Sequence, residues 1–119
     1  MKRTLILGAT PNPTRYAYEA ARRFTEEGID FVPVGIKKGE VFGKEIINDK
    51  SVFSDIDTIT LYVGPSKQEE WEDYILNTKP ARLIFNPGTE NTSLAQKAKK
   101  AGIEPIFACT LVMLSVGNY

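Results

Sequence analysis

The stretch from Thr4 to Phe24 constrains the fold most, because an apolar run in it breaks at a glycine and then changes period. Leu5 to Leu7 is apolar throughout, as expected of a strand that is buried on both faces of a parallel sheet. From Ala17 onward, small and apolar residues recur at helical spacing on one face. The stretch therefore predicts a strand that runs through a tight turn into a helix.

The turn between this strand and helix has features of a phosphate site. Asn12 and Pro13 are suited to be the N-cap and the first helical residue. A helix that begins at the carboxyl edge of a sheet offers free amides and a positive dipole end to an anion. The three-glycine dinucleotide fingerprint is absent after Gly8, so Thr10, Asn12 and Arg15 are expected to supply part of the contact. A tight turn in any α/β protein would show the same pattern.

Strand and helix patterns alternate along the rest of the chain. Further strands are expected at residues 31–36, 58–63, 82–86 and 105–109. This alternation predicts a single α/β domain over residues 1–119, with a Rossmann-like, doubly wound, mainly parallel sheet of about five strands and helices on both faces. Ligands of such sheets bind beyond the carboxyl ends of the strands.

Charge and residue usage argue against several functions. The 15 basic and 15 acidic residues give a net charge of zero, which favours neither a nucleic acid nor a membrane as partner. No run approaches the ~20 apolar residues that span a bilayer, and no signal-peptide pattern follows Met1, so we expect a cytoplasmic protein. The single cysteine excludes an internal disulfide and fits a reducing compartment. Homo-oligomerisation is left open.

The chain contains no histidine. This removes histidine acid–base catalysis, the serine–histidine and cysteine–histidine nucleophile pairs and ordinary zinc sites from a single chain. We therefore expect a binding protein with no catalytic residue and no metal site.

The end of the second predicted strand bears on the choice of nucleotide. An NAD-binding domain places an acidic residue there for the ribose hydroxyls, whereas this chain has Gly35 followed shortly by Lys37 and Lys38. Lysines favour a phosphate on the ribose, which means coenzyme A or NADP rather than NAD. A solvated lysine pair on a loop would look the same. A second candidate is the loop 86–91, whose six turn-type residues exceed what a short connection needs.

Four segments resemble a known family: GATPNPTRY at 8–16, TLYVGP at 60–65, IFNPGTEN at 84–91 and ACTLVML at 108–114. They are similar to the small stand-alone CoA-binding proteins, which are related to the nucleotide-binding domain of the succinyl-CoA synthetase alpha subunit. The similarity covers essentially the whole chain. It implies a Rossmann-like CoA-binding domain without a catalytic partner domain. The phosphorylated histidine of the synthetase has no counterpart here, so ligase activity is not implied.

The resemblance also implies a role for each loop. The first loop would hold the pyrophosphate, residues 34–37 would border the adenosine end, and the later loops would line the cleft and approach the pantetheine arm. The sequence departs from similar proteins at 35–39, where those proteins continue Val-Asn-Pro. Together with the lysine pair, the expected cofactor-binding residues are Gly8, Ala9, Thr10, Asn12, Arg15, Val34, Gly35, Lys37, Lys38, Gly64, Pro65, Asn86, Pro87 and Gly88.

The leading hypothesis is therefore a protein that binds coenzyme A or an acyl-CoA without catalytic activity of its own. One alternative fills the same site with an NADP-type dinucleotide. Another is a thiol or redox function, in which Cys109 forms a mixed disulfide with CoA. Cys109 is expected at the end of a strand before a helix, where the pKa of a thiol can fall, although free cysteines are more often small buried hydrophobes.

Overall fold

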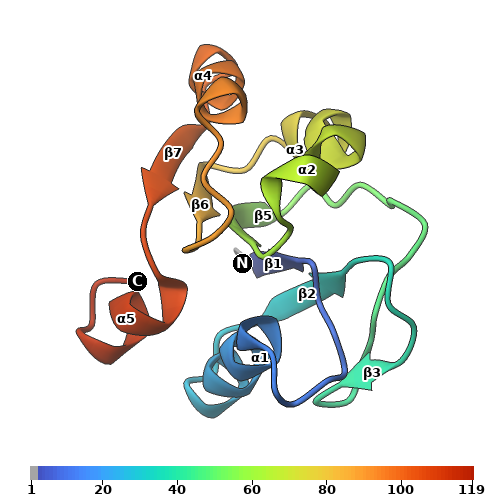
Figure 1. Cartoon of the computed structure of the whole chain (residues 1–119). Coiled ribbons are helices and arrows are strands. Elements are labelled where there is room, and N and C mark those ends of the chain that lie inside the picture. Colours follow the sequence, from blue (N-terminus) through green and yellow to red (C-terminus); the bar gives the residue numbers. More distant parts are fainter. Residues whose placement is uncertain (1–2) are drawn as a thin grey trace.

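The computed structural model of the chain describes residues 3–119. Its elements are β1 (Arg3–Leu7), α1 (Tyr16–Glu26), β2 (Phe31–Val34), β3 (Glu40–Val41), β4 (Lys44–Glu45), β5 (Ile56–Leu61), α2 (Pro65–Gln68), the 3-10 turn η1 (Glu69–Trp71), α3 (Glu72–Thr78), β6 (Arg82–Phe85), α4 (Thr92–Lys100), β7 (Glu104–Phe107) and α5 (Thr110–Ser115). Figure 1 labels all of them except β4 and η1. Five strands form one parallel sheet in the order β2-β1-β5-β6-β7, and β3 and β4 form a small antiparallel hairpin.

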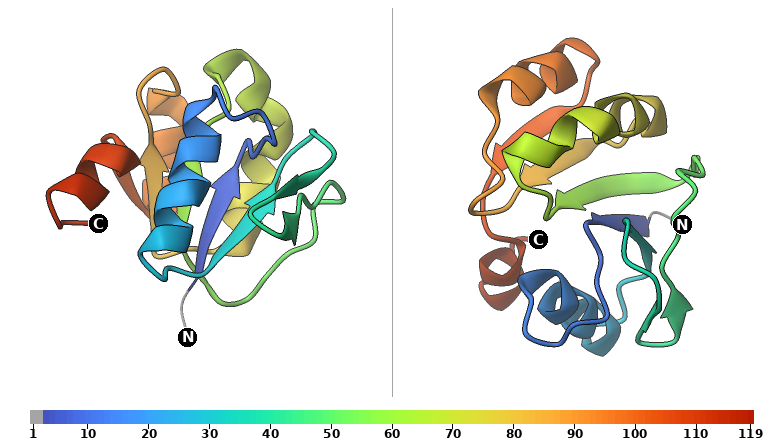
Figure 2. Two further views of the ribbon diagram at one scale, coloured as in Figure 1. Left: turned by 90° about the horizontal axis from the view of Figure 1, so that it is seen from below. Right: turned by 45° about the vertical axis from the view of Figure 1, so that its right-hand side comes forward.

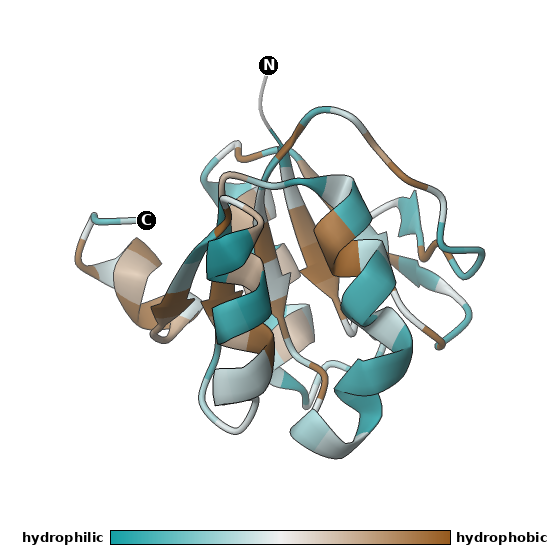
Figure 3. Ribbon diagram, turned by 90° about the horizontal axis from the view of Figure 1, so that it is seen from above, coloured by the Kyte–Doolittle hydropathy of each residue, from teal (hydrophilic) through white to brown (hydrophobic). Residues whose placement is uncertain are grey.

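Helices cover both faces of the sheet, as the two views of Figure 2 show. One face packs against α3 and α4 through Leu5 and Leu7 of β1, and the other packs against α1 and α5 through Ile6. All three side chains are fully buried, so β1 is the two-sided central strand that its apolar run predicts. Figure 3 shows the resulting separation, with hydrophobic strands inside and hydrophilic helix surfaces outside. The predicted Rossmann-like α/β fold is confirmed.

Both edge strands carry a proline whose missing N–H faces away from the sheet. The carbonyl of Pro33 accepts from the amide of Ile47 at 2.9 Å on the outer side of β2. The amide of Glu104 in β7 donates to the carbonyl of Ala81, just before β6, and the amide of Ala108, just after β7, donates to Phe85 of β6. Pro105, the neighbour of Glu104 in the strand, is therefore directed outward. A proline in that position removes an edge donor, which weakens pairing with another chain.

The sequence places the start of α1 too early. Asn12 and Pro13 lie in a turn, and the helix begins at Tyr16 with Arg15 in the N-cap position. Asn12 Oδ1 instead accepts from the amide of Thr14 at 3.0 Å and from its hydroxyl at 2.8 Å. Asparagine commonly makes such a local turn in competition with capping.

No helix within residues 3–119 has the length and apolarity needed to cross a membrane.

Three strands come together at the carboxyl end of β1. Gly8 has a φ of +99°, and a Cβ there would lie 3.0 Å from the carbonyl carbon of Tyr62. Gly35 is similarly close, since its Cβ would lie 3.2 Å from the amide nitrogen of Ala9. Only residues without a Cβ therefore let the loops after β1, β2 and β5 approach one another this closely.

We expect Gly8→Ala to lower the free energy of unfolding by about 3 kcal/mol, because it adds a steric clash to the cost of a positive φ. Gly28→Ala is the matched control, since Gly28 has a φ of +71° and a methyl group there would meet nothing within 4 Å. The control should lose only about 1 kcal/mol. Urea denaturation measures both, and equal losses would show that the close approach at Gly8 is unimportant.

Candidate functional site

The candidate site is a cavity of about 630 Å³ at the carboxyl edge of the sheet. It is formed by the loops after β1, β2, β5 and β6, together with the start of α1 and the segment of α2 and η1. Ligands of doubly wound sheets bind at this edge. Nine of the residues expected from the sequence line it: Gly8, Ala9, Thr10, Arg15, Gly35, Lys37, Gly64, Pro87 and Gly88.

The N-terminus of α1 opens into this cavity without a side-chain cap. Tyr16 and Ala17, the first two helical residues, line the cavity. The first backbone bond of the helix is donated by Glu19 to the carbonyl of Arg15, so the amides of Tyr16 and Ala17 lack an acceptor among residues 3–119. Free amides at the positive end of an 11-residue helix suit an anion.

Three cationic side chains line the cavity, namely Arg15, Lys37 and Lys67. None of them makes a side-chain hydrogen bond or ion pair within the part of the chain that the structure describes. Glu70 is the one carboxylate in the lining within the same residues. In a chain whose net charge is zero, this is a local excess of positive charge that is available to a ligand.

A buried glutamine fixes two walls of the cavity to each other. The Gln68 side chain is fully buried, and its Nε2 donates to the carbonyls of Val63 at 2.8 Å and Thr89 at 2.7 Å. Its Oε1 accepts from Nδ2 of Asn91 at 2.9 Å. The loop after β5 is thus tied to the loop after β6, which gives the cavity a preformed shape.

Asn86 has a structural role that the sequence does not reveal. The sequence predicts that it contacts the ligand, but in the structure the residue is 2% exposed and does not line the cavity. Its Nδ2 donates to the Thr60 hydroxyl at 2.8 Å and the Leu61 carbonyl at 2.9 Å, while its Oδ1 accepts from the amide of Thr110 at 2.8 Å. The side-chain amide of Asn86 therefore makes its hydrogen bonds within the protein, where it joins the end of β6 to β5 and to the start of α5.

Four other expected residues also lie outside the cavity lining. Val34 is fully buried in the core, because its position in β2 directs the side chain toward the sheet interior. Asn12, Lys38 and Pro65 are exposed beside the cavity-forming loops. The prediction assigned whole loops, whereas only part of each loop lines the cavity.

Several residues that line the cavity are absent from the list of expected cofactor-binding residues. Tyr16 and Ile36 are large apolar side chains with exposures of 76% and 67%. Such residues in polar loops are a usable signal of a ligand contact, and Tyr16 was missed because the helix start was misplaced. The other lining residues outside that list are Ala17, Tyr62, Val63, Lys67, Glu70, Trp71 and Thr89, of which Thr89, like Ile36, belongs to a stretch that the sequence marked as a candidate.

One residue of the cavity lining carries a buried hydroxyl. Tyr62 is among the residues that line the cavity, and its Oη is buried and has no hydrogen-bond partner among the described residues. Burial raises the pKa of this phenol to about 12. The side chain is therefore neutral near pH 7 and contributes an apolar surface.

Cys109 occupies the N-cap position of α5 and is partly exposed. It does not line the cavity. The structure therefore does not bring this thiol into contact with the candidate site.

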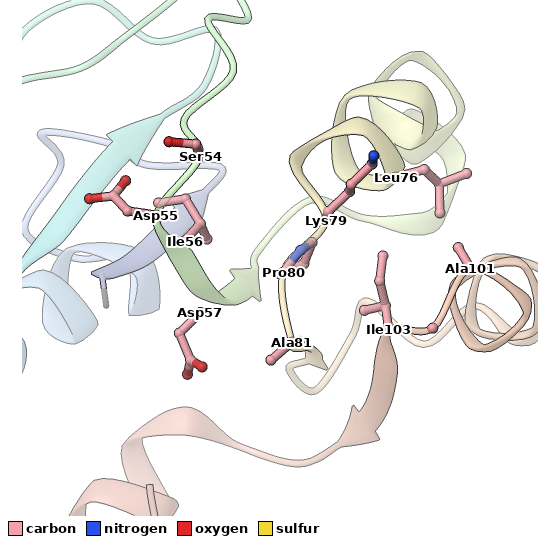
Figure 4. A pocket seen from close by; sticks show the side chains of 11 residues that line it. Ser54, Asp55, Ile56, Asp57, Leu76, Lys79, Pro80, Ala81, Ala101 and Ile103 are labelled. Carbon is pink, nitrogen blue, oxygen red and sulfur yellow. The ribbon is translucent and has the colours of Figure 1, made fainter. Parts of the chain in front are cut away.

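A second hollow, of about 700 Å³, lies at the opposite edge of the sheet (Figure 4). Helices α3 and α4 end there, so their negative dipole ends and the carboxylates of Asp55 and Asp57 border it. Arg3 donates to both carboxylate oxygens of Asp55 at 2.8 Å and holds the pKa of that carboxyl below its usual value. Lys79 also lines this hollow, but two carboxylates and two helix C-termini suit a phosphate less well than the lining of the carboxyl-edge cavity.

A family model described as a CoA binding domain matches residues 2–115. The chain belongs to this CoA-binding domain family. No curated protein matches it. The family resemblance seen in the four sequence segments is thus confirmed. Membership of this family suggests CoA as the small-molecule ligand.

Solved structures share the fold of this CoA-binding domain. A crystal structure of an uncharacterized protein is 56% identical, covers 100% of this chain and 98% of that chain, and superposes with a TM-score of 0.98. A hypothetical protein from Pyrococcus horikoshii OT3 is 27% identical over 91% of this chain and 76% of that chain, with a TM-score of 0.80. A Thermus thermophilus protein is 23% identical over 99% of this chain and 90% of that chain, with a TM-score of 0.86, and this likeness shows the fold alone.

We expect Tyr62→Phe to raise the free energy of unfolding by about 1 kcal/mol, because it removes a buried hydroxyl that has no partner among the described residues. The gain should widen at high pH. The wild-type phenol has an unfolded pKa of about 10 and a folded pKa of about 12, so its ionisation increasingly favours the unfolded state of the wild type as the pH rises through that interval. Urea denaturation between neutral pH and pH values above ~10 measures this. A loss of stability on removing the hydroxyl would contradict it.

Proposed function

We propose that this chain binds coenzyme A or an acyl-CoA in the carboxyl-edge cavity and has no catalytic activity of its own. The observation that carries the proposal is the uncapped N-terminus of α1, which opens into a cavity lined by cations that have no ion-pair partner among residues 3–119. CoA contributes a terminal thiol that carries acyl groups as thioesters. Its phosphates are the part of the ligand that this lining suits best.

The pyrophosphate is placed at the start of α1. The amides of Tyr16 and Ala17 are free to donate there, and Arg15 supplies a charge at the same turn. Gly8 allows the backbone to come close to the phosphates. The preformed donors require no rearrangement of the helix.

The adenosine end is placed at the loop after β2. Lys37 lines the cavity and is available to the 3′-phosphate of the ribose, whereas its neighbour Lys38 lies outside the lining. Ile36 and Tyr16 give this end exposed apolar surface that a ligand would cover. An NADP-type ligand shares the phosphates but lacks the pantetheine arm, for which the cavity continues past Gly64 to Pro87 and Gly88.

The residues of the cavity favour binding over catalysis. The chain has no histidine, and within residues 3–119 the lining includes one carboxylate, Glu70, and no cysteine. General acid–base or nucleophilic chemistry needs an arranged pair of such groups. Cys109, the candidate for a mixed disulfide, lies outside the lining.

We expect Arg15→Ala to weaken CoA binding about tenfold, because a charge-assisted hydrogen bond contributes about 1.5–3 kcal/mol. The loss should be the same for CoA and 3′-dephospho-CoA, since Arg15 is assigned to the pyrophosphate. Calorimetric titration measures both affinities. Unchanged affinity would remove Arg15 from the phosphate site, and tight binding of NADPH without binding of CoA would overturn the proposed function.

The adjacent lysines provide a matched pair of variants. Lys37→Ala should weaken CoA about tenfold and leave 3′-dephospho-CoA unaffected, because only CoA carries the ribose phosphate. Lys38→Ala should change neither ligand by more than about twofold, because an exposed charge outside the cavity contributes little. The same titration in both variants tests this, and equal effects of the two substitutions would refute the assignment of Lys37.

A further inference from the structure

The loop after β2, residues 35–39, carries the lysine assigned to the ribose phosphate and has little structure of its own. It contains no helix or strand, and a glycine stands at each end, Gly35 and Gly39. Glycine leaves the backbone free to adopt many conformations. The three residues between the glycines are exposed. The position of Lys37 therefore depends on contacts that the loop makes with the rest of the protein.

Two backbone hydrogen bonds fix the ends of this loop. The amide of Gly35 donates to the Ile47 carbonyl at 3.1 Å, and the Gly39 carbonyl accepts from the amide of Ile46 at 2.9 Å. Both partners belong to the segment that follows β4. Neither bond reaches the middle of the loop, where Lys37 lies.

Asn48, in the same segment, is the side chain that fixes the middle of the loop. Its Nδ2 donates to the carbonyl of Gly35 at 2.6 Å and to the carbonyl of Lys37 at 2.9 Å. Among residues 3–119, no other side chain forms a hydrogen bond with this loop. A side-chain amide has two donor hydrogens, so one asparagine can bridge two carbonyls. Asn48 itself does not line the cavity.

Two residues further along, Lys50 ties the same segment to another part of the cavity lining. Its Nζ donates to the backbone carbonyl of Glu70 at 2.7 Å and lies 4.7 Å from the centre of the Trp71 ring. Glu70 and Trp71 belong to η1, and both line the cavity. The segment 46–50 thus connects the loop after β2 to η1, and Asn48 holds that loop from a support that is itself attached to the cavity.

We propose that Asn48 is a positioning residue for Lys37, so that the preference of the cavity for a phosphorylated ribose depends on a side chain outside the lining. This rests on the proposed binding of CoA in the carboxyl-edge cavity. A lysine on an unrestrained loop loses conformational entropy when it binds a phosphate, and this loss reduces the affinity. Because Asn48 holds the backbone of Lys37 in place, part of that entropy is already lost in the free protein.

The experiment titrates CoA and 3′-dephospho-CoA calorimetrically into wild-type protein and into Asn48→Ala. We expect Asn48→Ala to weaken CoA binding about fivefold, because the hydrogen bonds that hold Lys37 are removed. The affinity for 3′-dephospho-CoA should change by less than about twofold, because this ligand lacks the phosphate that Lys37 contacts.

Asp49→Asn is the matched control. Asp49 is exposed, and its carboxylate accepts from the amide and the hydroxyl of Ser51 and forms no hydrogen bond with the loop 35–39. The substitution keeps the size of the side chain and should change neither affinity by more than about twofold.

A double variant distinguishes positioning from a general structural effect. In the Lys37→Ala background, Asn48→Ala should change the affinity for CoA by less than about twofold, because the residue that Asn48 positions no longer has its charge. A purely structural role would weaken both ligands equally, and the loss would persist in that background.

A second measurement needs no ligand. The carbonyls that Asn48 holds share their peptide groups with the amides of Ile36 and Lys38, so these two amide signals should shift in free Asn48→Ala and stay in place in Asp49→Asn. The remaining signals show that each variant is folded.

The outcomes separate this inference from the proposed function. Unchanged loop signals, unchanged affinity for CoA, an equal loss for both ligands, or an undiminished loss in the Lys37→Ala background would each overturn the role of Asn48 while leaving CoA binding intact. Failure of the wild type to bind CoA would overturn both.

Discussion

The site depends on the close approach of three backbone segments where β1 ends. The amide of Tyr62 donates to the Leu7 carbonyl at 2.8 Å, and the amide of Gly8 donates to the Val34 carbonyl at 2.9 Å. These bonds fix the register of β1, β2 and β5, so that the loops that follow these strands meet around one cavity. The absence of a Cβ at Gly8 and Gly35 allows this geometry. The free amides of α1 are presented at that junction, and the proposed anion site follows from it.

The fold could be predicted because its signals are local and mutually consistent. The apolar run of β1, the β-branched run of β5 and the glycine stop at Gly28 each have a direct physical reading, and the structure places a strand, a strand and a helix end there. The sequence also predicts that the loops after β1, β2, β5 and β6 meet, because the carboxyl ends of parallel strands must lie at one edge. Nine expected residues consequently line the cavity.

The sequence could not determine what each polar side chain contacts. Asn86 and Asn12 look alike as turn residues, yet Asn86 is buried in hydrogen bonds to β5 and α5, partners that lie 24 to 26 positions away. Asn12 bonds within its own turn and leaves α1 uncapped. Lys67 is not among the expected binding residues, because its place in the cavity lining arises from the tertiary position of α2. Such long-range choices are fixed by tertiary structure and carry no local pattern.

We propose that CoA binds at the carboxyl edge of the sheet. The most direct test of this binding site is to follow the amide chemical shifts of isotope-labelled protein during addition of CoA. We predict shifts at Thr10, Tyr16, Ala17 and Gly88, and none at Ala101 in the hollow at the opposite edge. Shifts confined to that opposite hollow, or none at saturating CoA, would contradict binding at the carboxyl edge.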